Sequence, residues 1–276
     1  MKKIKFSFFR HNRKILPNYI RDNAFMISCA ARSGSTYLVH LIRSHPDLFF
    51  HGEILAGEKV NGLLGEYEKK LQENPALRDV LFQEREKNPA LFLYKYGFDT
   101  QGYKGVGFKY KTDESLLDEY RQRTEAVVRD KDIKIIFLLR RNLLAQYVSH
   151  QVVLQQTGQT FAVHEEDVPQ IDKLTIDPQK CIVYIKNVIN RQKQVEKMFL
   201  MHRTFHIRYE DIVEGAPEKK TVLADLQKFL GVQNVDLSSP TKKIIREPLA
   251  KLVINYDEVC QELKRHKMGR FTPGFK

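Results

Sequence analysis

A cluster of small and polar residues follows the first apolar segment of the sequence and could bind an anion. Phe25–Cys29 is a short, mostly apolar run with the length of a buried strand. Ala30–Thr36 comes next, and apolar side chains then recur at helical spacing as far as Arg43. Where a strand turns into a helix, free backbone N–H groups and the positive end of the helix dipole point into the turn. The pattern is typical of an anion-binding loop or of an ordinary strand–helix connection.

Five consecutive residues of this turn carry groups that bind a phosphate or a sulfate. Arg32 offers a fixed positive charge, and Gly34 allows close approach of the backbone. Ser33 lies between them, and Ser35 and Thr36 offer hydroxyl groups. In nucleotide hydrolases a lysine precedes the Ser or Thr of the loop and reaches the β- and γ-phosphates. Ser35 stands at that position here, so the loop predicts phosphate binding without the group that a triphosphate needs.

A second basic segment follows the most apolar strand of the sequence. Ile133–Leu139 ends in Arg140 and Arg141 and leads through Asn142 into a predicted helix that carries Ser149. An arginine at the head of a helix and a hydroxyl on its flank are good ligands for a terminal phosphate. The same residues could instead form ion pairs and an exposed serine, so this segment alone leaves both interpretations open.

Apolar periodicity alternates between strands and helices along the chain. Strands are predicted at residues 25–29, 48–50, 105–110, 133–139 and 205–209. Helices are predicted at residues 37–43, 63–88 and 112–129, from 142, and at 178–199, 217–230 and 253–266. The alternation predicts an α/β fold with a parallel sheet covered by helices on both faces. In such sheets ligands bind beyond the carboxyl ends of the strands.

The chain is expected to form a single domain over residues 1–276, without an internal repeat or a linker. Residues 1–24 carry seven Lys or Arg and one acidic residue, which predicts a basic N-terminal arm that lies over the domain or contacts a membrane surface. Residues 157–177 are polar and show neither period, and a loop of that length in a compact domain is usually functional or disordered.

Composition restricts the class of protein. A net charge of +12 and 42 % hydrophobic residues suit a sizeable core and an anionic ligand or surface. Three widely spaced cysteines form no disulfide framework, and no apolar run approaches the ~20 residues that span a bilayer. The N-terminus lacks the apolar region of a secretory signal, so we expect a soluble, cytoplasmic protein. The histidines and cysteines predict no structural metal site.

Four segments resemble those of the sulfotransferases that use 3′-phosphoadenosine-5′-phosphosulfate (PAPS), and the sequence is most similar to the bacterial carbohydrate branch, which includes the nodulation-factor sulfotransferases. The four segments are Arg32–Thr36, Arg141 with Ser149, Ser44–Asp47 with Gly52–Glu53, and Ile207–Ile212 with Phe229–Val232. The sequence departs from the family pattern at Ala31 and Leu143, where proline is frequent, and it contains no tryptophan.

The resemblance implies a three-layer P-loop-like fold with a central parallel sheet flanked by helices. It implies transfer of a sulfuryl group from PAPS to a hydroxyl of a carbohydrate or glycoconjugate, without a metal, and release of adenosine 3′,5′-bisphosphate (PAP). The loop Arg32–Thr36 would bind the 5′-phosphosulfate, and Arg32 would also stabilise the charge on the leaving phosphate. Arg141 and Ser149 would bind the 3′-phosphate.

A general base must remove the proton of the acceptor hydroxyl, and Glu53 matches the family position of that carboxylate. His51 alternates with Glu53 on the predicted strand, so both side chains could face the cleft, and His40 and His150 are further rivals for the role. Lys109, at the end of another predicted strand, would meet the sulfonate or the acceptor.

The acceptor is expected to bind over the polar regions 54–100 and 157–177. A nucleotide kinase or hydrolase of the same architecture is an alternative, but the missing loop lysine speaks against it. A protein that uses its basic charge to bind nucleic acid or a membrane surface is another. The basic residues are dispersed, with no helix-turn-helix, RNA-binding or zinc signature, so no nucleic-acid partner is expected.

Overall fold

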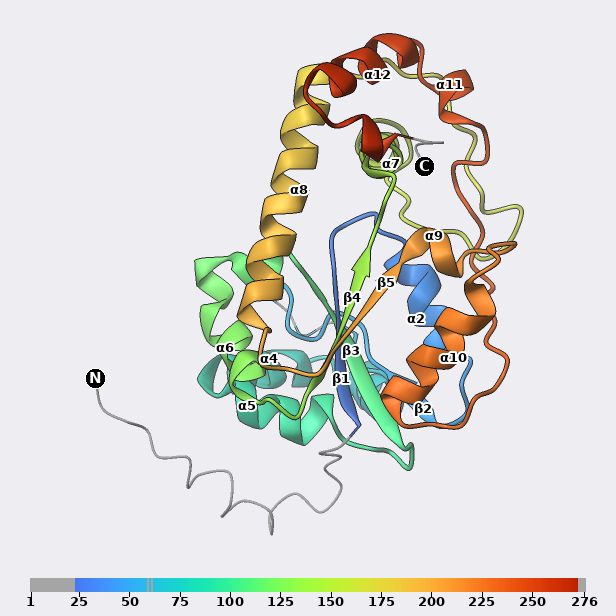
Figure 1. Ribbon diagram of the computed structural model, residues 1–276. Coiled ribbons are helices and arrows are strands. Elements are labelled where there is room, and N and C mark those ends of the chain that lie inside the picture. Colours follow the sequence, from blue (N-terminus) through green and yellow to red (C-terminus); the bar gives the residue numbers. More distant parts are fainter. Residues whose placement is uncertain (1–22, 59, 61, 273–276) are drawn as a thin grey trace.

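Five parallel strands form a single sheet at the centre of the molecule (Figure 1). The computed structural model describes residues 23–58, 60 and 62–272. The strands are β1 (Ala24–Cys29), β2 (Leu48–Phe50), β3 (Gly105–Lys111), β4 (Lys134–Leu139) and β5 (Thr204–Arg208). Their order is β2-β3-β1-β4-β5, and every neighbouring pair is parallel. The predicted α/β fold is confirmed, whereas most of the expected arm, residues 1–22, lies outside the described residues.

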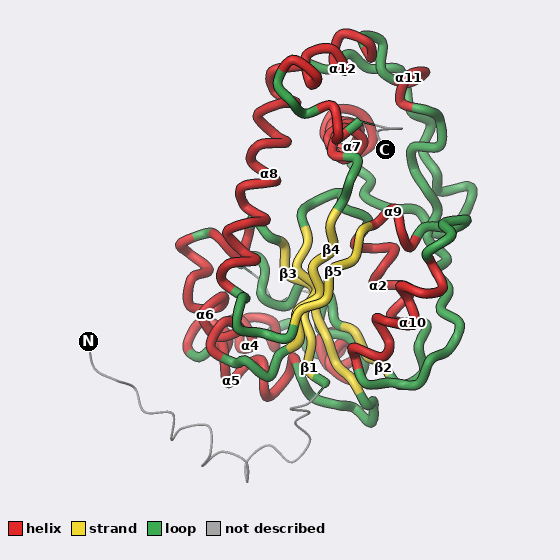
Figure 2. The backbone as a smooth tube through the Cα atoms, in the orientation of Figure 1, coloured by secondary structure: helices red, strands yellow, loops and turns green. Residues whose placement is uncertain are grey.

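Helices cover both faces of this sheet (Figure 2). The α-helices are α2 (Ser35–Arg43), α3 (Glu66–Glu73), α4 (Leu77–Lys87), α5 (Pro89–Phe92), α6 (Arg121–Arg129), α7 (Leu143–Val152), α8 (Pro178–Met198), α9 (Tyr209–Ile212), α10 (Lys219–Leu230), α11 (Leu249–Leu252) and α12 (Tyr256–Arg265). Shorter 3₁₀ or π turns are η2 (Leu93–Gly97), η3 (Glu114–Leu116), η4 (Asp118–Tyr120), η5 (Val153–Thr157) and η6 (Gly269–Phe271).

The helix expected over residues 112–129 is present only in its second half. Leu117 has an extended backbone (ψ 134°), which separates η3 from η4 and leaves α6 to begin at Arg121. The hydroxyl of Ser115 donates to the carbonyl of Thr112, and Thr124 donates to the carbonyl of Ser115. These side-chain contacts satisfy backbone groups that a continuous helix would pair internally, so the turn replaces the predicted helix start.

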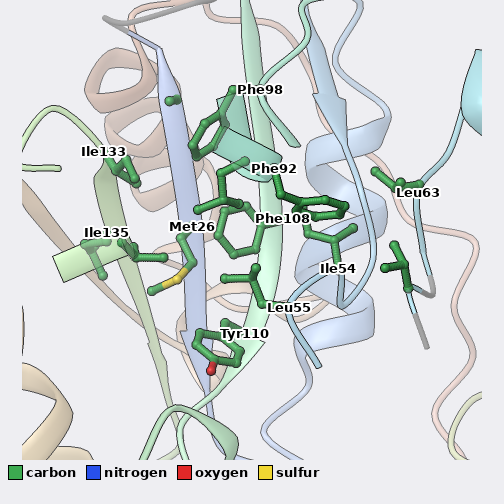
Figure 3. Close-up of a cluster of buried hydrophobic side chains, with 14 of the residues drawn as sticks. Met26, Ile54, Leu55, Leu63, Phe92, Phe98, Phe108, Tyr110, Ile133 and Ile135 are labelled. Atoms are coloured by element: carbon green, nitrogen blue, oxygen red, sulfur yellow. The ribbon is translucent and has the colours of Figure 1, made fainter. Parts of the chain in front are cut away.

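Alternate side chains of the central strands build two apolar layers. Met26 and Phe108 belong to the cluster on the face covered by α4, α5 and α6, whereas Phe25 and Ile27 belong to the cluster on the face covered by α2 and α10. Figure 3 shows the first cluster, in which side chains from residues 54–98 pack on β1 and β3. The stretch 54–100, expected to serve the acceptor, therefore supplies much of the core on this face.

A third apolar cluster lies beyond the carboxyl ends of the strands. It joins α7, α8, α11 and α12 and includes Leu174 and Ile176 from the segment 157–177. The 21 residues of α8 span about 30 Å, so one end packs on the sheet cluster through Val195 and the other on this helical cap through Ile182 (Figure 1). The carboxyl edge of the sheet thus faces a second layer of structure. Within the described ranges, no helix is both long enough and apolar enough to cross a membrane.

Replacing Phe108 by alanine should destabilise the fold strongly. Phe108 is completely buried, and its ring centroid lies 5.7 Å from that of Phe98. Phe→Ala substitutions in cores cost about 3–5 kcal/mol because they remove apolar contacts and leave a cavity. Denaturant unfolding of Phe108→Ala should show that loss, whereas Leu200→Ala, at a site that is 75 % exposed, should change the free energy of unfolding by about 0.5 kcal/mol or less. Equal losses in both variants would contradict the assignment of the core.

Candidate functional site

The loop Ala30–Gly34 joins β1 to α2 at the carboxyl edge of the sheet. Gly34 has a left-handed backbone (φ 88°), and a side-chain carbon at this position would lie 2.1 Å from the Tyr209 ring, so only glycine fits. Arg32 is also left-handed (φ 61°). For a residue other than glycine this conformation costs on the order of 1–3 kcal/mol, and such strain gathers at ligand-binding sites.

The Arg32 side chain joins three segments that are far apart in the sequence. Its Nε donates a hydrogen bond to Ser149 Oγ on α7 at 3.1 Å, and its Nη1 donates to the carbonyl oxygen of Thr160 at 2.6 Å. Thr160 lies in the segment 157–177. The two predicted phosphate-binding segments and the predicted acceptor loop therefore meet at one guanidinium group.

Two side chains fix the loop through its carbonyl oxygens. Arg140 Nη1 donates to the carbonyl of Arg32 at 2.8 Å, and Gln146 Nε2 donates to the carbonyl of Ala31 at 2.7 Å. The Arg140 guanidinium also stacks on the Tyr209 ring, 4.9 Å from its centroid. Burial lowers the pKa of both Arg32 and Arg140, and the charge of Arg140 lowers that of Arg32 further. A second positive charge near Arg32 makes the site favourable for an anion.

The start of α2 presents further donors at the same place. Backbone N–H groups in the first turn of a helix have no intrahelical acceptor, and here they belong to residues that include Ser35 and Thr36. Ser33 is 1 % exposed, and within the described chain its hydroxyl has no hydrogen-bond partner. This residue lines a cavity of about 10 Å³ that Arg140 and Gln146 also line, which is close to the least space that holds a water molecule.

Arg141 and Ser149, the predicted 3′-phosphate ligands, lie just before α7 and in its second half, and they contact different groups. The Arg141 guanidinium forms an ion pair with Asp211, whereas Ser149 accepts the hydrogen bond from Arg32. The carboxylate of Glu210 accepts hydrogen bonds from the backbone N–H groups of Arg141 at 3.0 Å and Asn142 at 3.1 Å, just before α7. The two acids thus hold the turn from β4 into α7.

Glu53 lies between two lysines of β3. Its Oε1 is 2.9 Å from Lys109 Nζ and its Oε2 is 2.8 Å from Lys111 Nζ, and Lys111 also pairs with Glu114 at 3.1 Å. Burial raises the pKa of Glu53, but the two ammonium groups outweigh it and the net pKa lies below its usual value. Burial opposes the charge of Lys111, yet its two carboxylate partners raise its pKa. Glu53 is therefore an ionised carboxylate across the neutral range.

Cys29 lies between this charged cluster and the loop Ala30–Gly34. Burial raises the pKa of the Cys29 thiol most, whereas the charge of Lys109 and a hydrogen bond with Ser35 lower it, and the charge of Glu53 raises it. Cys29 is the last residue of β1, and its register partner on β3 is Lys111. The structure thus places Glu53 and Lys109 beside the loop Ala30–Gly34.

The three histidines considered as bases lie in different surroundings. His51 is completely buried, its Nδ1 accepts the N–H of Leu64 at 3.2 Å, and burial lowers its pKa to about 4. It therefore packs inside the fold as a neutral group, whereas the Glu53 side chain is only partly buried, at 26 % exposed. Burial and Arg43 lower the pKa of His40, and burial and the charge of Arg32 lower that of His150.

Sequence reasoning did not assign a role to four residues of the site, which are Lys111, Arg140, Gln146 and Tyr209. Signals for two of them are present in the sequence. Lys111 follows Lys109 by two residues and so faces the same side of a strand, and Gln146 precedes Ser149 by three residues and so shares a helix face. Across the part of the chain that the structure describes, no three or more His, Cys, Asp or Glu side chains gather as they do around a metal ion.

Comparisons with known proteins return structural similarity only. No protein-family model and no curated protein matches the sequence. A sulfotransferase from Alicyclobacillus acidocaldarius is 17 % identical, with a TM-score of 0.46 over 90 % of this chain and 96 % of that one. Mouse sulfotransferase SULT7A1 complexed with PAP is 13 % identical, with a TM-score of 0.40 over 81 % of this chain and 64 % of that one. The present chain therefore spans less than two thirds of the mouse protein, and similarities at these values assign neither a family nor an activity.

His51 should remain unprotonated across the range in which a histidine normally titrates. Its lowered pKa means that the unfolded chain binds the proton more readily, so stability should fall as the pH drops from about 6.5 towards about 4. NMR of ¹⁵N-histidine-labelled protein, with the signals assigned by comparison with His51→Gln, should show no transition of His51 above pH 5.5. A midpoint near 6.5 would show that the imidazole is accessible and would restore it as a candidate base.

Proposed function

We propose that the protein is a PAPS-dependent sulfotransferase that transfers a sulfuryl group to a hydroxyl of a carbohydrate or glycoconjugate. The observation that carries the proposal is the hydrogen bond from Arg32 Nε to Ser149 Oγ. It joins the loop expected to bind the 5′-phosphosulfate to the helix expected to bind the 3′-phosphate. A donor with two phosphate groups on one ribose needs two anion sites close together, and this contact supports such an arrangement.

The positive groups of the site fit a donor with two phosphates. Arg32 and the first N–H groups of α2 would hold the 5′-phosphosulfate, with the hydroxyls of Ser35 and Thr36 beside them. Arg141 and Ser149 would hold the 3′-phosphate, for which Arg141 would exchange its ion pair with Asp211. Position 35 carries a serine rather than the lysine that reaches a γ-phosphate, which disfavours a kinase or a nucleotide hydrolase.

Sulfuryl transfer requires one bond to form as another breaks. The acceptor oxygen would attack sulfur in line with the bond to the 5′-phosphate oxygen, which breaks and leaves its electron pair on PAP. Glu53 would take the proton of the acceptor hydroxyl, and the loop with Arg32 would stabilise the growing charge on the phosphate. Once Glu53 is protonated its attraction for Lys109 weakens, and that ammonium group becomes available to neutralise negative charge.

The segment 157–177 is the proposed acceptor loop because Thr160 contacts Arg32. Beside Thr160, Phe161 is 45 % exposed and Gln159 is partly exposed. An exposed aromatic ring packs against the apolar face of a sugar, and an amide side chain donates and accepts hydrogen bonds with its hydroxyls. These neighbours support a carbohydrate acceptor. The contribution expected from residues 54–100 is reduced, since many of these residues lie in the core.

PAP should bind the folded protein and raise its melting temperature. A ligand at 100 times its dissociation constant stabilises the folded state by about 2.7 kcal/mol, which corresponds to several degrees. Arg32→Ala and Arg141→Ala should each weaken binding by about 10- to 100-fold, because each removes charged hydrogen bonds to a phosphate. Arg129→Ala, on α6 and paired with Glu125, is the matched control and should bind like the wild type. The absence of any shift in the wild-type protein would refute the proposed donor.

Glu53→Gln should keep donor binding and lose turnover. Glutamine has the size of glutamate but cannot take the acceptor proton, and a general base contributes about 10²–10⁴-fold to the rate. The loss is measured as kcat with PAPS and a panel of oligosaccharides, and PAP binding is measured on the same variant. In the wild type, the lowered pKa of Glu53 should keep the acid limb of the kcat profile below pH 4.5, the usual value for glutamate. Full activity in Glu53→Gln would move the base to another group, such as His150.

A further inference from the structure

Two buried arginines hold the chain that follows Glu53. Arg85 on α4 is completely buried and donates to three backbone carbonyls, those of Ile54 and Ala56 at 3.0 Å each and that of Gly57 at 2.6 Å. Its guanidinium thus spans a loop that begins one residue after the proposed base. Burial lowers the pKa of Arg85, which records the cost of keeping its charge inside the fold.

Arg123 reaches the same loop from α6. Its Nη1 donates to the carbonyls of Leu55 at 2.9 Å and Gly57 at 3.0 Å, and its side chain is 5 % exposed. One carboxylate serves both arginines, because Glu86 Oε1 lies 2.9 Å from Arg123 Nη2 and 3.1 Å from Arg85 Nε. The ring of Tyr120 lies 4.1 Å from the Arg123 guanidinium carbon. We call Arg85, Arg123 and Glu86 the arginine clamp.

The composition of the arginine clamp is costly for a purely structural role. Two guanidinium groups share the single carboxylate of Glu86, which leaves one positive charge in excess. Among the described residues, the other acceptors of these two groups are backbone carbonyls. Burying a charge costs several kcal/mol, and apolar residues of similar volume usually replace such groups without loss of stability. The carbonyls that receive these hydrogen bonds are consecutive, at residues 54–57, which points to the position of this loop as the purpose.

The remaining contacts of Glu53 show what the loop controls. On one side of Glu53, the carbonyl of Gly52 accepts the N–H of Lys109 at 3.1 Å, and the N–H of Gly52 donates to the carbonyl of Gly62 at 2.6 Å. On the other side, the N–H of Ala56 donates to the carbonyl of Glu53 at 3.1 Å, inside the segment that the arginine clamp holds. The backbone of Glu53 is therefore fixed from both sides.

We propose that Arg85 and Arg123 are positioning residues, which hold the loop Ile54–Gly57 so that the Glu53 carboxylate stays between Lys109 and Lys111. As a statement about catalysis this rests on the proposed function, whereas the positioning of Glu53 does not. The charged and titratable groups that face Glu53 are Lys109 and Lys111 on β3, Glu114 on η3 and Cys29 on β1. A looser loop would separate Glu53 from the two lysines, and the pKa of Glu53 would rise because these ammonium groups lower it.

Arg123→Lys and Arg85→Lys test this role, because lysine keeps the charge but cannot donate to two carbonyls and a carboxylate at fixed angles. Arg129→Lys, on the same helix as Arg123 but exposed, is the matched control. Small displacements of catalytic groups lower rates by up to about 10²-fold, so kcat should fall by about 10- to 100-fold in the clamp variants. Their PAP-induced shift in melting temperature and their KM for PAPS should stay at the wild-type values, and the control should match the wild type in all three.

A second readout does not depend on activity. In protein labelled with ¹³C at the glutamate carboxyl carbon, the Glu53 signal is identified by its absence in Glu53→Gln, and its titration midpoint should be higher in Arg123→Lys than in the wild type. Should Arg85→Lys fail to fold, Arg123→Lys and Glu86→Gln carry the test. A wild-type midpoint in a folded clamp variant would overturn the positioning role, as would a loss of PAP binding in proportion to kcat. If the Glu53 midpoint is higher in Arg123→Lys than in the wild type but the wild-type protein does not turn over PAPS, the proposed function is refuted and the positioning of Glu53 remains supported.

Discussion

The concentration of positive charge at the carboxyl edge of the sheet depends on the contact between Arg32 and α7. Arg32 adopts a strained backbone conformation so that its side chain meets Ser149, and Arg140 holds the Arg32 carbonyl from the neighbouring strand. Each of these groups comes from a different segment, and the parallel order β1–β4 brings them together.

A second electrostatic arrangement lies beside the first and has the opposite design. Around Arg32 and Arg140 the described residues supply one acidic partner, Glu210, whose carboxylate lies 3.9 Å from Arg140 Nε, so positive charge is in excess and favours an anionic ligand. Around Glu53 two lysines and Glu114 balance one another within about 3 Å, which keeps the carboxylate ionised without a ligand. A site that must bind an anion and accept a proton needs both arrangements close together, and the two are joined through Cys29 and the β1–β3 pairing.

The sequence predicts the parallel sheet and the strand–turn–helix at residues 25–43 well, because these depend on local patterns, whereas the order of the strands comes only from the structure. Apolar runs and helical spacing mark the strands and most helices, and the small residues after Cys29 mark the turn. The sequence predicts poorly which polar side chains are buried. His51 alternates with Glu53 along the chain, yet the strand ends at Phe50 and residues 51–53 have no regular structure, so alternation no longer decides which face a side chain takes. Arg85 and Arg123 lie on charged helices whose pattern predicts solvent exposure, and only the tertiary fold supplies the carbonyls that accept their hydrogen bonds.

One guanidinium group connects the two substrate regions of the proposed site. Arg32 uses Nη1 on the carbonyl of Thr160, and the same side chain lies where a donor phosphate would bind. Its number of N–H groups is finite, so a ligand that takes some of them changes the free energy with which the loop 157–177 is held. This effect is reciprocal, because the factor by which the donor changes the affinity for the acceptor equals the factor by which the acceptor changes the affinity for the donor. If the proposed function holds, the affinities for the donor and the acceptor would therefore be coupled through the Arg32 side chain.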